Sequence, residues 1–285
     1  MSASPRFTGD LSSLWKLQNL PPIHHLTWDW WWWLVMLDDE GGNPAGKQLM
    51  VLWSTKDNPL VEVNGHPWTP VGRPGFDEDG GIAMDGMVAA WWYDGKELIE
   101  PLVLEESRIL VVSEDHPKWP YEKGGIVASC TENEFSMGLN SQENEFWLIL
   151  ESEHGKFDLR MTPWNNAMSS MKVAQAEYGL GMGYGISRLH GALCSGKIDE
   201  KEVNGSAYFQ KVCVQAPSPP WFWGMLHLDD GSYIDWFVPH VSPTLTAKDP
   251  RHWKRRDITH YPLSMGGLFH DVTRQRSEKF SEVRV

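Results

Sequence analysis

Cysteine is scarce in this chain of 285 residues, which holds only 3 of them: Cys130, Cys194 and Cys213. They stand far apart, and none belongs to a Cys-x-x-Cys pair. An odd number of separated cysteines argues against a disulfide framework and for a reducing compartment. Residues 1–20 also lack the apolar core of a signal peptide, so the sequence predicts a cytoplasmic protein.

Long apolar runs are missing as well. The run from Trp30 to Leu37 is too short to cross a bilayer, which takes about 20 apolar residues in a helix. The sequence therefore predicts no transmembrane segment.

Basic residues are outnumbered, with 25 Lys and Arg against 38 Asp and Glu and a formal charge of −13. This charge repels phosphate backbones and anionic membranes over most of the molecule, which argues against nucleic acid as a partner. The basic run Arg251–Arg256 is a local exception. We interpret it as a solvated loop, with a phosphate or lipid-headgroup contact as the alternative, the latter for substrate pickup at a membrane. The oligomeric state stays open.

Motifs for metals and common cofactors are absent too. There is no Gly-x-Ser-x-Gly or His-Glu-x-x-His motif, and the 11 histidines lack metal-ligand spacing. Gly179–Gly185 alternates glycine with larger residues but lacks the spacing of a dinucleotide-binding loop. We expect no metal and no cofactor.

Tryptophan, by contrast, is abundant, with 17 copies. Trp28–Leu37 combines aromatic and branched residues at the length of a β-strand that is buried on both sides. Alternation then turns Asp29, Trp31 and Trp33 to one side and Trp28, Trp30 and Trp32 to the other. In a closed barrel, one set of side chains would line the interior, and the other set would pack under an outer layer.

Short strands joined by Gly and Asp turns follow along the chain, which is typical of an antiparallel β-barrel or sandwich. Residues 1–22 form a polar lead-in. We place an N-terminal β-domain at residues 23–165 and a C-terminal β-domain at residues 166–285. A short helix around residues 167–178 connects them.

Three side chains are candidates for acid catalysis. Asp29 lies within the Trp strand, Asp235 shares a strand face with Tyr233, and His227 is in line with Trp221 and Trp223. Adding water to an alkene requires a proton donor, and an apolar environment keeps a carboxylic acid neutral. Each has a structural alternative: Asp29 as a hydrogen-bond acceptor, Asp235 facing solvent, and His227 as a structural histidine.

Aromatic and amide side chains on the same strands are the candidates for ligand contact, since indoles suit a large flat apolar ligand touched at a few polar points. Gln210 would orient a carbonyl or a water, unless it points outward. The candidate ligand-binding residues are Trp31, Trp33, Trp91, Tyr208, Gln210, Trp221, Trp223 and Tyr233.

Three stretches carry a family resemblance: Trp28–Trp33 before an acidic turn, Gly205–Gln210, and Trp221–Trp223 followed by Leu228–Ser232. Over residues 25–285 the chain resembles the carotenoid 1,2-hydratase (hydroxyneurosporene synthase) and AttH-like group, which includes lipocalin-like Diels–Alderases. The resemblance implies an all-β protein of two lipocalin-like antiparallel β-barrel domains, with a hydrophobic ligand in a Trp-lined pocket. Gln210-Lys211 stands where the hydratases carry an acidic or His-containing stretch, so that acid does not transfer.

Several functions remain open at this point. The first is an enzyme that acts on an isoprenoid or polyketide-like ligand, by hydration or by shape-directed cyclisation. The second is a carrier of lipid or pigment without catalysis. The third, a carbohydrate-binding module, fits least, because Trp30–Leu37 is too uniformly apolar for a surface platform.

Overall fold

Within the computed structural model, the residues with a described placement are 5–17, 23, 26–38, 46–56, 61–63, 66–68, 75–113, 122–129, 134–164, 172–179, 181–217, 219–241 and 261–283. The chain divides into two compact units, Met1–Ala216 and Pro217–Val285. The division falls at the Pro-rich stretch Pro217–Pro220, where the polypeptide leaves the last strand of the first unit.

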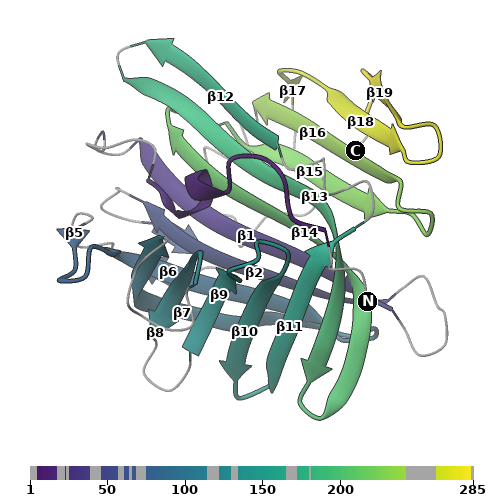
Figure 1. The fold of residues 1–285 in the computed structure, drawn as a ribbon. Helices are drawn as coiled ribbons and strands as arrows, with labels where there is room; N and C mark the ends of the chain where they lie inside the picture. Colours follow the sequence, from purple (N-terminus) through teal and green to yellow (C-terminus); the bar gives the residue numbers. More distant parts are fainter. Residues whose placement is uncertain are drawn as a thin grey trace. The chain divides into compact units, whose positions relative to one another are not determined.

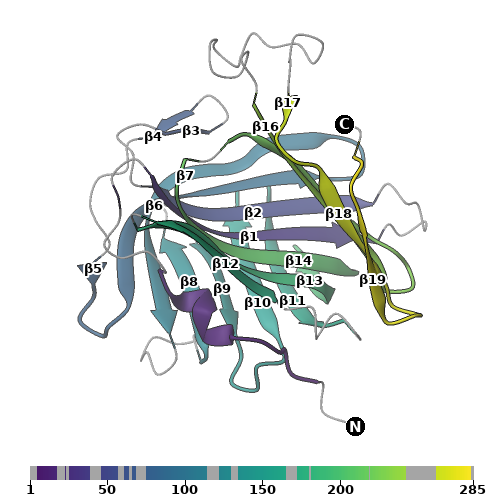
Figure 2. The same cartoon turned by 90° about the horizontal axis from the view of Figure 1, so that it is seen from above.

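The first unit is a closed barrel of 10 antiparallel strands (Figures 1 and 2). The order around the ring is β1-β2-β6-β7-β8-β9-β10-β11-β13-β14, and β14 returns to β1. The strands are β1 (Thr27–Leu37), β2 (Lys47–Lys56), β6 (Ile82–Tyr93), β7 (Leu98–Ser113), β8 (Gly124–Ser129), β9 (Glu134–Leu139), β10 (Phe146–Ser152), β11 (Gly155–Pro163), β13 (Met182–Ile198) and β14 (Lys201–Gln215). Shorter strands are β3 (Val61–Val63), β4 (His66–Trp68) and β5 (Gly75–Phe76). The predicted all-β class and antiparallel barrel are confirmed.

The barrel closes through the pairing of β11 with β13, which runs from Phe157 opposite Ile198 to Pro163 opposite Ala192. Without β13 and β14, the strands before residue 165 would leave the edges of β1 and β11 unpaired, and such edges invite aggregation. The first unit therefore extends to Ala216, beyond the boundary at 165/166 expected from sequence.

The predicted connecting helix needs a correction. Residues 172–179 form strand β12 (Lys172–Gly179), which pairs in antiparallel register with β13. Its backbone hydrogen bonds go to the neighbouring strand, and this pairing overrides the helical spacing of alanines and methionines. Residues 167–171 of the predicted helix lie outside the described residues.

The barrel interior is a continuous apolar core. Residues 1–22, expected as a polar lead-in, contribute to it through the short 3-10 helix η1 (Leu11–Trp15), because Phe7, Leu14 and Trp15 are all buried there. Helix η1 packs near β7 and β8 (Figure 2).

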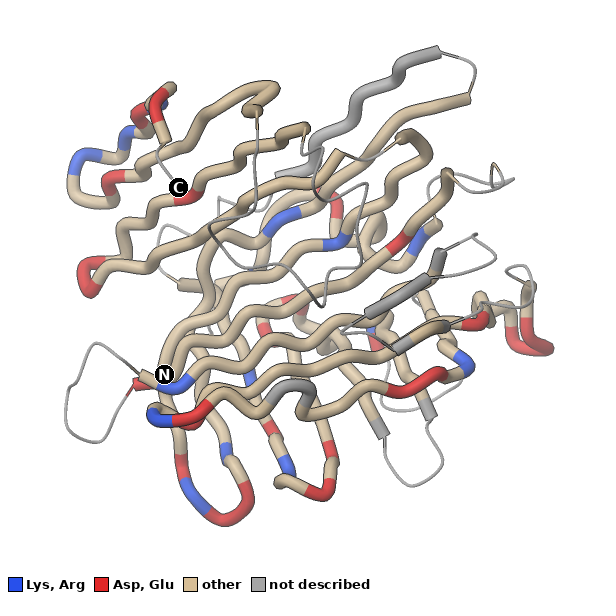
Figure 3. Tube along the Cα trace, turned by 180° about the vertical axis from the view of Figure 1, so that it is seen from behind, with Lys and Arg blue, Asp and Glu red and all other residues tan. Residues whose placement is uncertain are grey.

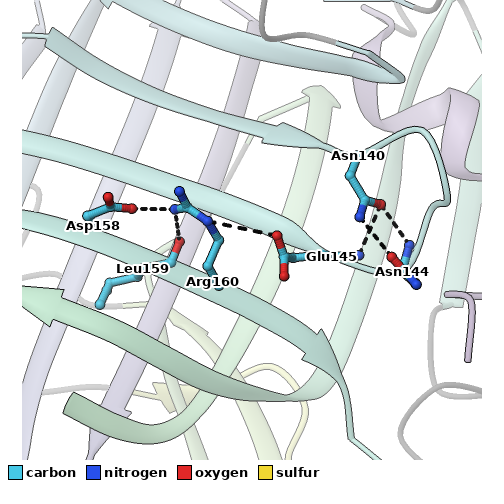
Figure 4. A network of polar contacts seen from close by, with 6 residues as sticks. All are labelled: Asn140, Asn144, Glu145, Asp158, Leu159 and Arg160. Atoms are coloured by element: carbon cyan, nitrogen blue, oxygen red, sulfur yellow. Dashed lines mark hydrogen bonds and ion pairs between the residues drawn. The ribbon is translucent and has the colours of Figure 1, made fainter. Parts of the chain in front are cut away.

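Many of the charged positions along the barrel's backbone trace lie at or near the turns between strands (Figure 3). The turn between β9 and β10 shows how such a turn is fixed (Figure 4): the Asn140 Oδ1 atom accepts hydrogen bonds from the backbone N–H groups of Asn144 at 3.0 Å and Glu145 at 3.2 Å. On β11, Arg160 forms an ion pair with Asp158 and lies 3.8 Å from a Glu145 oxygen. These polar groups stabilise the barrel rim.

The second unit is a sheet with the order β15-β16-β18-β19, and β17 pairs with the end of β16. Its strands are β15 (Trp221–His227), β16 (Tyr233–Val241), β17 (Tyr261–Pro262), β18 (Gly266–Asp271) and β19 (Arg276–Phe280). A second barrel was expected here. In the part of the unit that the structure describes, β15 and β19 each pair with one strand only, so the sheet is open.

Among the described residues, no helix has the length and apolar character needed to cross a membrane.

The close approach of β14 to β1 requires glycine at position 205. A Cβ atom there would lie 2.1 Å from the Met36 carbonyl oxygen and 2.7 Å from the Leu37 Cα, both backbone atoms that cannot rotate away. We predict that Gly205→Ala lowers the free energy of unfolding by about 1–3 kcal/mol, measured by urea denaturation. Gly75→Ala, where nothing lies within 4 Å of the added Cβ, is the matched control. Equal unfolding midpoints for the two variants would contradict this account.

Candidate functional site

The interior set of β1 side chains belongs to the core. Trp31 and Trp33 are fully buried, and the protein satisfies their indole N–H groups. Trp31 donates to the Leu14 carbonyl oxygen at 2.7 Å, and Trp33 donates to the Met137 sulfur at 3.0 Å. Core packing therefore accounts for both of these predicted ligand-binding residues.

Asp29 lies on the same interior side and forms an ion pair with Lys211 of β14. Both side chains are buried, at 3% and 1% relative exposure. The Lys211 ammonium also donates to the Val212 carbonyl oxygen at 3.1 Å and lies 4.2 Å from the centre of the Trp31 ring. A cation over an indole face gains electrostatic attraction, which adds to the ion pair in this dry environment.

This pairing assigns Asp29 a structural role. The Lys211 ammonium group donates to the Asp29 carboxylate, so this side chain is engaged in a contact between β14 and β1. Asp29, predicted as a catalytic acid, is therefore better placed to anchor β1 to β14.

Other polar side chains surround the same end of the barrel interior. Thr27 donates to the Gln215 amide oxygen at 2.6 Å, and Gln215 donates to the Gly181 carbonyl oxygen at 2.8 Å. Ser13 of η1 lies 3.1 Å from the Ser187 hydroxyl of β13. These contacts connect the N-terminal segment and β13 to the barrel.

The outward side chains of the same strands form a second arrangement, which we call the aromatic face. One row runs across four strands in register, from Trp91 on β6 through Met50 and Leu34 to Tyr208 on β14. The next row contains Leu52, Trp32, Gln210 and Arg188. Trp30 and Val212 form a third pair. These outward side chains of β1 and β14 are buried or half-buried, so little of this layer of indoles is open to water.

Polar side chains lie within the aromatic face, on and beside strand β14. The Tyr208 hydroxyl donates to the Gln210 amide oxygen at 3.0 Å, and both residues are buried, at 0% and 7% exposure. The Tyr208 ring contacts the rings of Trp32 and His190 edge-on, with centroids 6.2 and 6.1 Å away. Arg188, opposite Gln210 on β13, adds a cation. Apolar walls with a few fixed polar groups are characteristic of small-molecule sites.

One face of the second unit's sheet brings together five predicted residues. His227 lies opposite Tyr233, which lies opposite His270, so the three form a row across β15, β16 and β18. Asp235 follows two residues after Tyr233 on the same side. Trp223 and Trp221 continue this face along β15, beside Phe237 and Pro239.

The polar end of this face is the buried end. Burial raises the pKa of the Tyr233 hydroxyl well above its ordinary range, and the nearby Asp235 carboxylate raises it further. Tyr233 is therefore a neutral hydrogen-bond donor at physiological pH. The His270 ring stacks on the Tyr233 ring at 5.0 Å and is held by Ser277, whose hydroxyl lies 2.9 Å from Nδ1.

The predicted residues thus separate into three places. Two indoles and Asp29 lie in the barrel core, Trp91, Tyr208 and Gln210 lie on the aromatic face, and five residues share the face of the second sheet. Sequence reasoning missed Lys211, Arg188, His190 and His270. The alternation Phe209, Lys211, Cys213 was a usable signal, because it places a lysine on the apolar side of a strand.

No group of three or more His, Cys, Asp or Glu side chains is placed to hold a metal ion within the described ranges. The histidine pair His24-His25 and Cys130 lie outside them.

Fold and site together define an all-β protein built on a closed antiparallel barrel whose outer side carries an aromatic layer. Among solved structures, the chain is similar to a candidate AttH protein from Nitrosomonas europaea, with 12% identity, a TM-score of 0.48, and coverage of 97% of this chain and 75% of that one. It is also similar to CghA in complex with Sch210972, with 9% identity, a TM-score of 0.45, and coverage of 97% and 81%. A further CghA structure has 9% identity, a TM-score of 0.47, and coverage of 93% and 64%. No family model and no curated protein matches the sequence.

The buried ion pair leads to a stability prediction. Asp29→Asn leaves the Lys211 ammonium buried without a counter-charge and should lower the free energy of unfolding by about 3–5 kcal/mol. The double variant Asp29→Leu/Lys211→Met removes both charges and should recover most of that loss. Urea denaturation of the single and double variants measures both.

A matched control is the exposed pair Lys197–Glu202, whose charged atoms are 3.5 Å apart. Glu202→Gln should leave the unfolding midpoint unchanged, because water screens exposed pairs. If Asp29→Asn lowers the free energy of unfolding as little as Glu202→Gln does, the ion pair does not anchor β1.

The buried thiols lead to a prediction about pH. Burial raises the pKa of Cys194 to about 12, with a smaller contribution from Asp38, and Cys213 is also buried. In a Cys130→Ser background, a thiol reagent should label neither cysteine of the native protein at neutral pH, and both after unfolding.

Because the unfolded thiol ionises near pH 9.0 and the folded one does not, the free energy of unfolding should fall as pH rises above 9.0. Fast labelling of native Cys194 would contradict its burial.

Proposed function

We propose that this protein is an enzyme that binds a large, mainly apolar small molecule of isoprenoid or polyketide type on its aromatic face. The observation that carries the proposal is the registered layer of Trp91, Trp32 and Trp30 with Tyr208 and Gln210 set into it. Indoles supply large contact areas with few rotatable bonds, so they bind flat ligands at low entropic cost.

Cyclisation of a bound polyene is the reaction that this face supports first. A pericyclic ring closure needs a surface that folds the chain into a reactive conformation, together with hydrogen bonds that polarise one end. The Tyr208–Gln210 pair offers such hydrogen bonds, and no protein acid is required. The ion pairing of Asp29 therefore does not weigh against this reaction.

Hydration of an alkene is the second candidate, and a different observation favours it. Asp235 is buried at 8% exposure beside Tyr233, on the face that also carries His227. A carboxyl group beside a phenol and a histidine offers the kind of groups that general acid catalysis uses. The carrier function remains the alternative if the ligand leaves unchanged.

The test for binding is quenching of tryptophan fluorescence by retinol, a small isoprenoid polyene. Trp32→Ala should weaken binding by about tenfold, because it removes a large apolar contact. Tyr208→Phe and Gln210→Leu should each weaken it less. Leu98→Ala, which alters an exposed side chain of the first unit, should bind like the parent. Equal affinity for Trp32→Ala and the parent would overturn the site.

The test for chemistry is mass spectrometry of organic extracts after incubation with linear polyenes. Cyclisation gives an isomer of unchanged mass and should slow in Gln210→Leu. Hydration gives a product whose mass is higher by one water, and this product should be absent with Asp235→Asn. Recovery of unchanged polyene would leave a carrier and contradict both reactions.

A further inference from the structure

Arg188 gives the aromatic face its charge. It lies opposite Gln210 of β14, and Gln210 lies opposite Trp32 of β1, so the three side chains share one outward row. The other residues that we named in the three rows of this face carry aromatic, aliphatic, phenol or amide groups, and none of them is acidic. The named rows therefore combine an apolar layer with one positive charge at its β13 side.

The guanidinium group of Arg188 is partly withdrawn from water. The side chain is half-buried, and its Nε atom is buried. An electrostatic attraction is stronger in such surroundings than in bulk water, because less solvent screens it. A guanidinium is also less strongly hydrated than an ammonium group and presents its N–H donors in a planar fork that matches the two oxygens of a carboxylate. Arg188 is thus suited to hold an anionic group at the edge of the apolar layer.

Strand β13 is irregular directly after this arginine. Its register against β14 shifts between Leu189 and Ala192, so that His190 and Gly191 stand opposite Tyr208 alone. Such bulges redirect side chains and are frequent beside functional sites. Here the His190 ring meets the Tyr208 ring edge-on, with centroids 6.1 Å apart, and both side chains are buried. The bulge therefore places an imidazole and a phenol on the same outward side, two residues along the strand from the guanidinium.

The amide of Gln210 has a defined orientation beside Arg188. Its oxygen accepts the hydrogen bond of the Tyr208 hydroxyl at 3.0 Å, so the remaining polar atom of the amide is the N–H donor Nε2. Arg188 likewise offers only N–H donors. Two neighbouring strands thus present donors at one end of the apolar layer, and an acceptor group with negative charge complements them better than a hydroxyl or an amine does.

We propose that the ligand of the aromatic face is a polyene with a carboxylate or enolate at one end, and that Arg188 binds this anionic end beside Gln210. This inference rests on the proposed function. It deepens that function by naming the chemical class of the ligand and the residue that selects it. The apolar chain would lie against the indoles, and the charged end would set its direction on the face.

The experiment compares three probes that share one polyene chain: retinol, methyl retinoate and retinoic acid. Only retinoic acid is charged at neutral pH. Binding is measured by quenching of tryptophan fluorescence. We expect the parent protein to bind retinoic acid about tenfold more tightly than either neutral probe. Arg188→Met should bind all three probes alike, with the affinity for retinol unchanged. Arg188→Lys should keep part of the preference, because it retains the charge and loses the planar fork.

The matched control is Arg108→Met on β7. It removes an arginine that is 53% exposed and paired with Asp85 at 2.7 Å, and it should keep the full preference for retinoic acid. Circular dichroism establishes that each variant is folded, and the comparison of probes in the parent protein requires no variant.

The possible failures are distinguishable. Equal affinity of the parent protein for the three probes, with Trp32→Ala weakening all of them, would overturn this inference and leave the proposed function standing. A preference for retinoic acid that persists in Arg188→Met would overturn the role of Arg188. Quenching by none of the three probes would overturn the proposed function and this inference together.

Discussion

The register of β1 between β2 and β14 is the constraint on which the rest of the barrel depends. A shift of one residue would turn every side chain of β1 to the other side of the sheet. Trp31 and Trp33 would then leave the core, and Trp30 and Trp32 would leave the aromatic face. The ion pair between Asp29 and Lys211 opposes such a shift, because buried charges in any other register would lack partners. The ion pair between Asp29 and Lys211 thus helps to specify which indoles of β1 pack in the core and which point outward.

This division of one strand into two sides separates the indoles that fill the barrel core from those that point outward. The interior indoles satisfy their N–H groups with protein atoms, as Trp31 does with the Leu14 carbonyl oxygen, and so fill the barrel. The outward indoles lie beside Tyr208 and Gln210, whose hydrogen bond fixes a polar point in an apolar layer. The binding that we propose on the aromatic face would leave the packed core free to provide stability.

Much of the fold could be predicted from the sequence. Alternation along Trp28–Leu37 and the turn residues that follow predicted a two-sided strand in an antiparallel barrel, and the structure confirms both. The helix at residues 167–178 was a wrong prediction, because helical spacing of apolar residues says nothing about the long-range pairing of β12 with β13. The expected domain boundary at 165/166 differs from the structure for the same reason. Barrel closure pairs β11 with β13, and no local sequence pattern predicts this pairing.

The candidate site could be predicted only in part from the sequence, for a related reason. Sequence alternation placed Asp235, Tyr233 and His227 on faces that the structure brings together, but His270 joins them only through the pairing of β16 with β18. Similarly, Asp29 looked like an acid beside indoles until Lys211, 182 positions away, was found next to it. Residue type predicts what a side chain can do, whereas its partners across the sheet decide what it does.

The aromatic face is the central claim, and a crystal structure of the protein grown with a bound linear polyene would test it most directly. The account predicts that the polyene lies along the outward side of β1 and β14, against Trp32 and Tyr208, with one end near Gln210. A polyene found inside the barrel between Trp31 and Trp33, with η1 displaced, would contradict it.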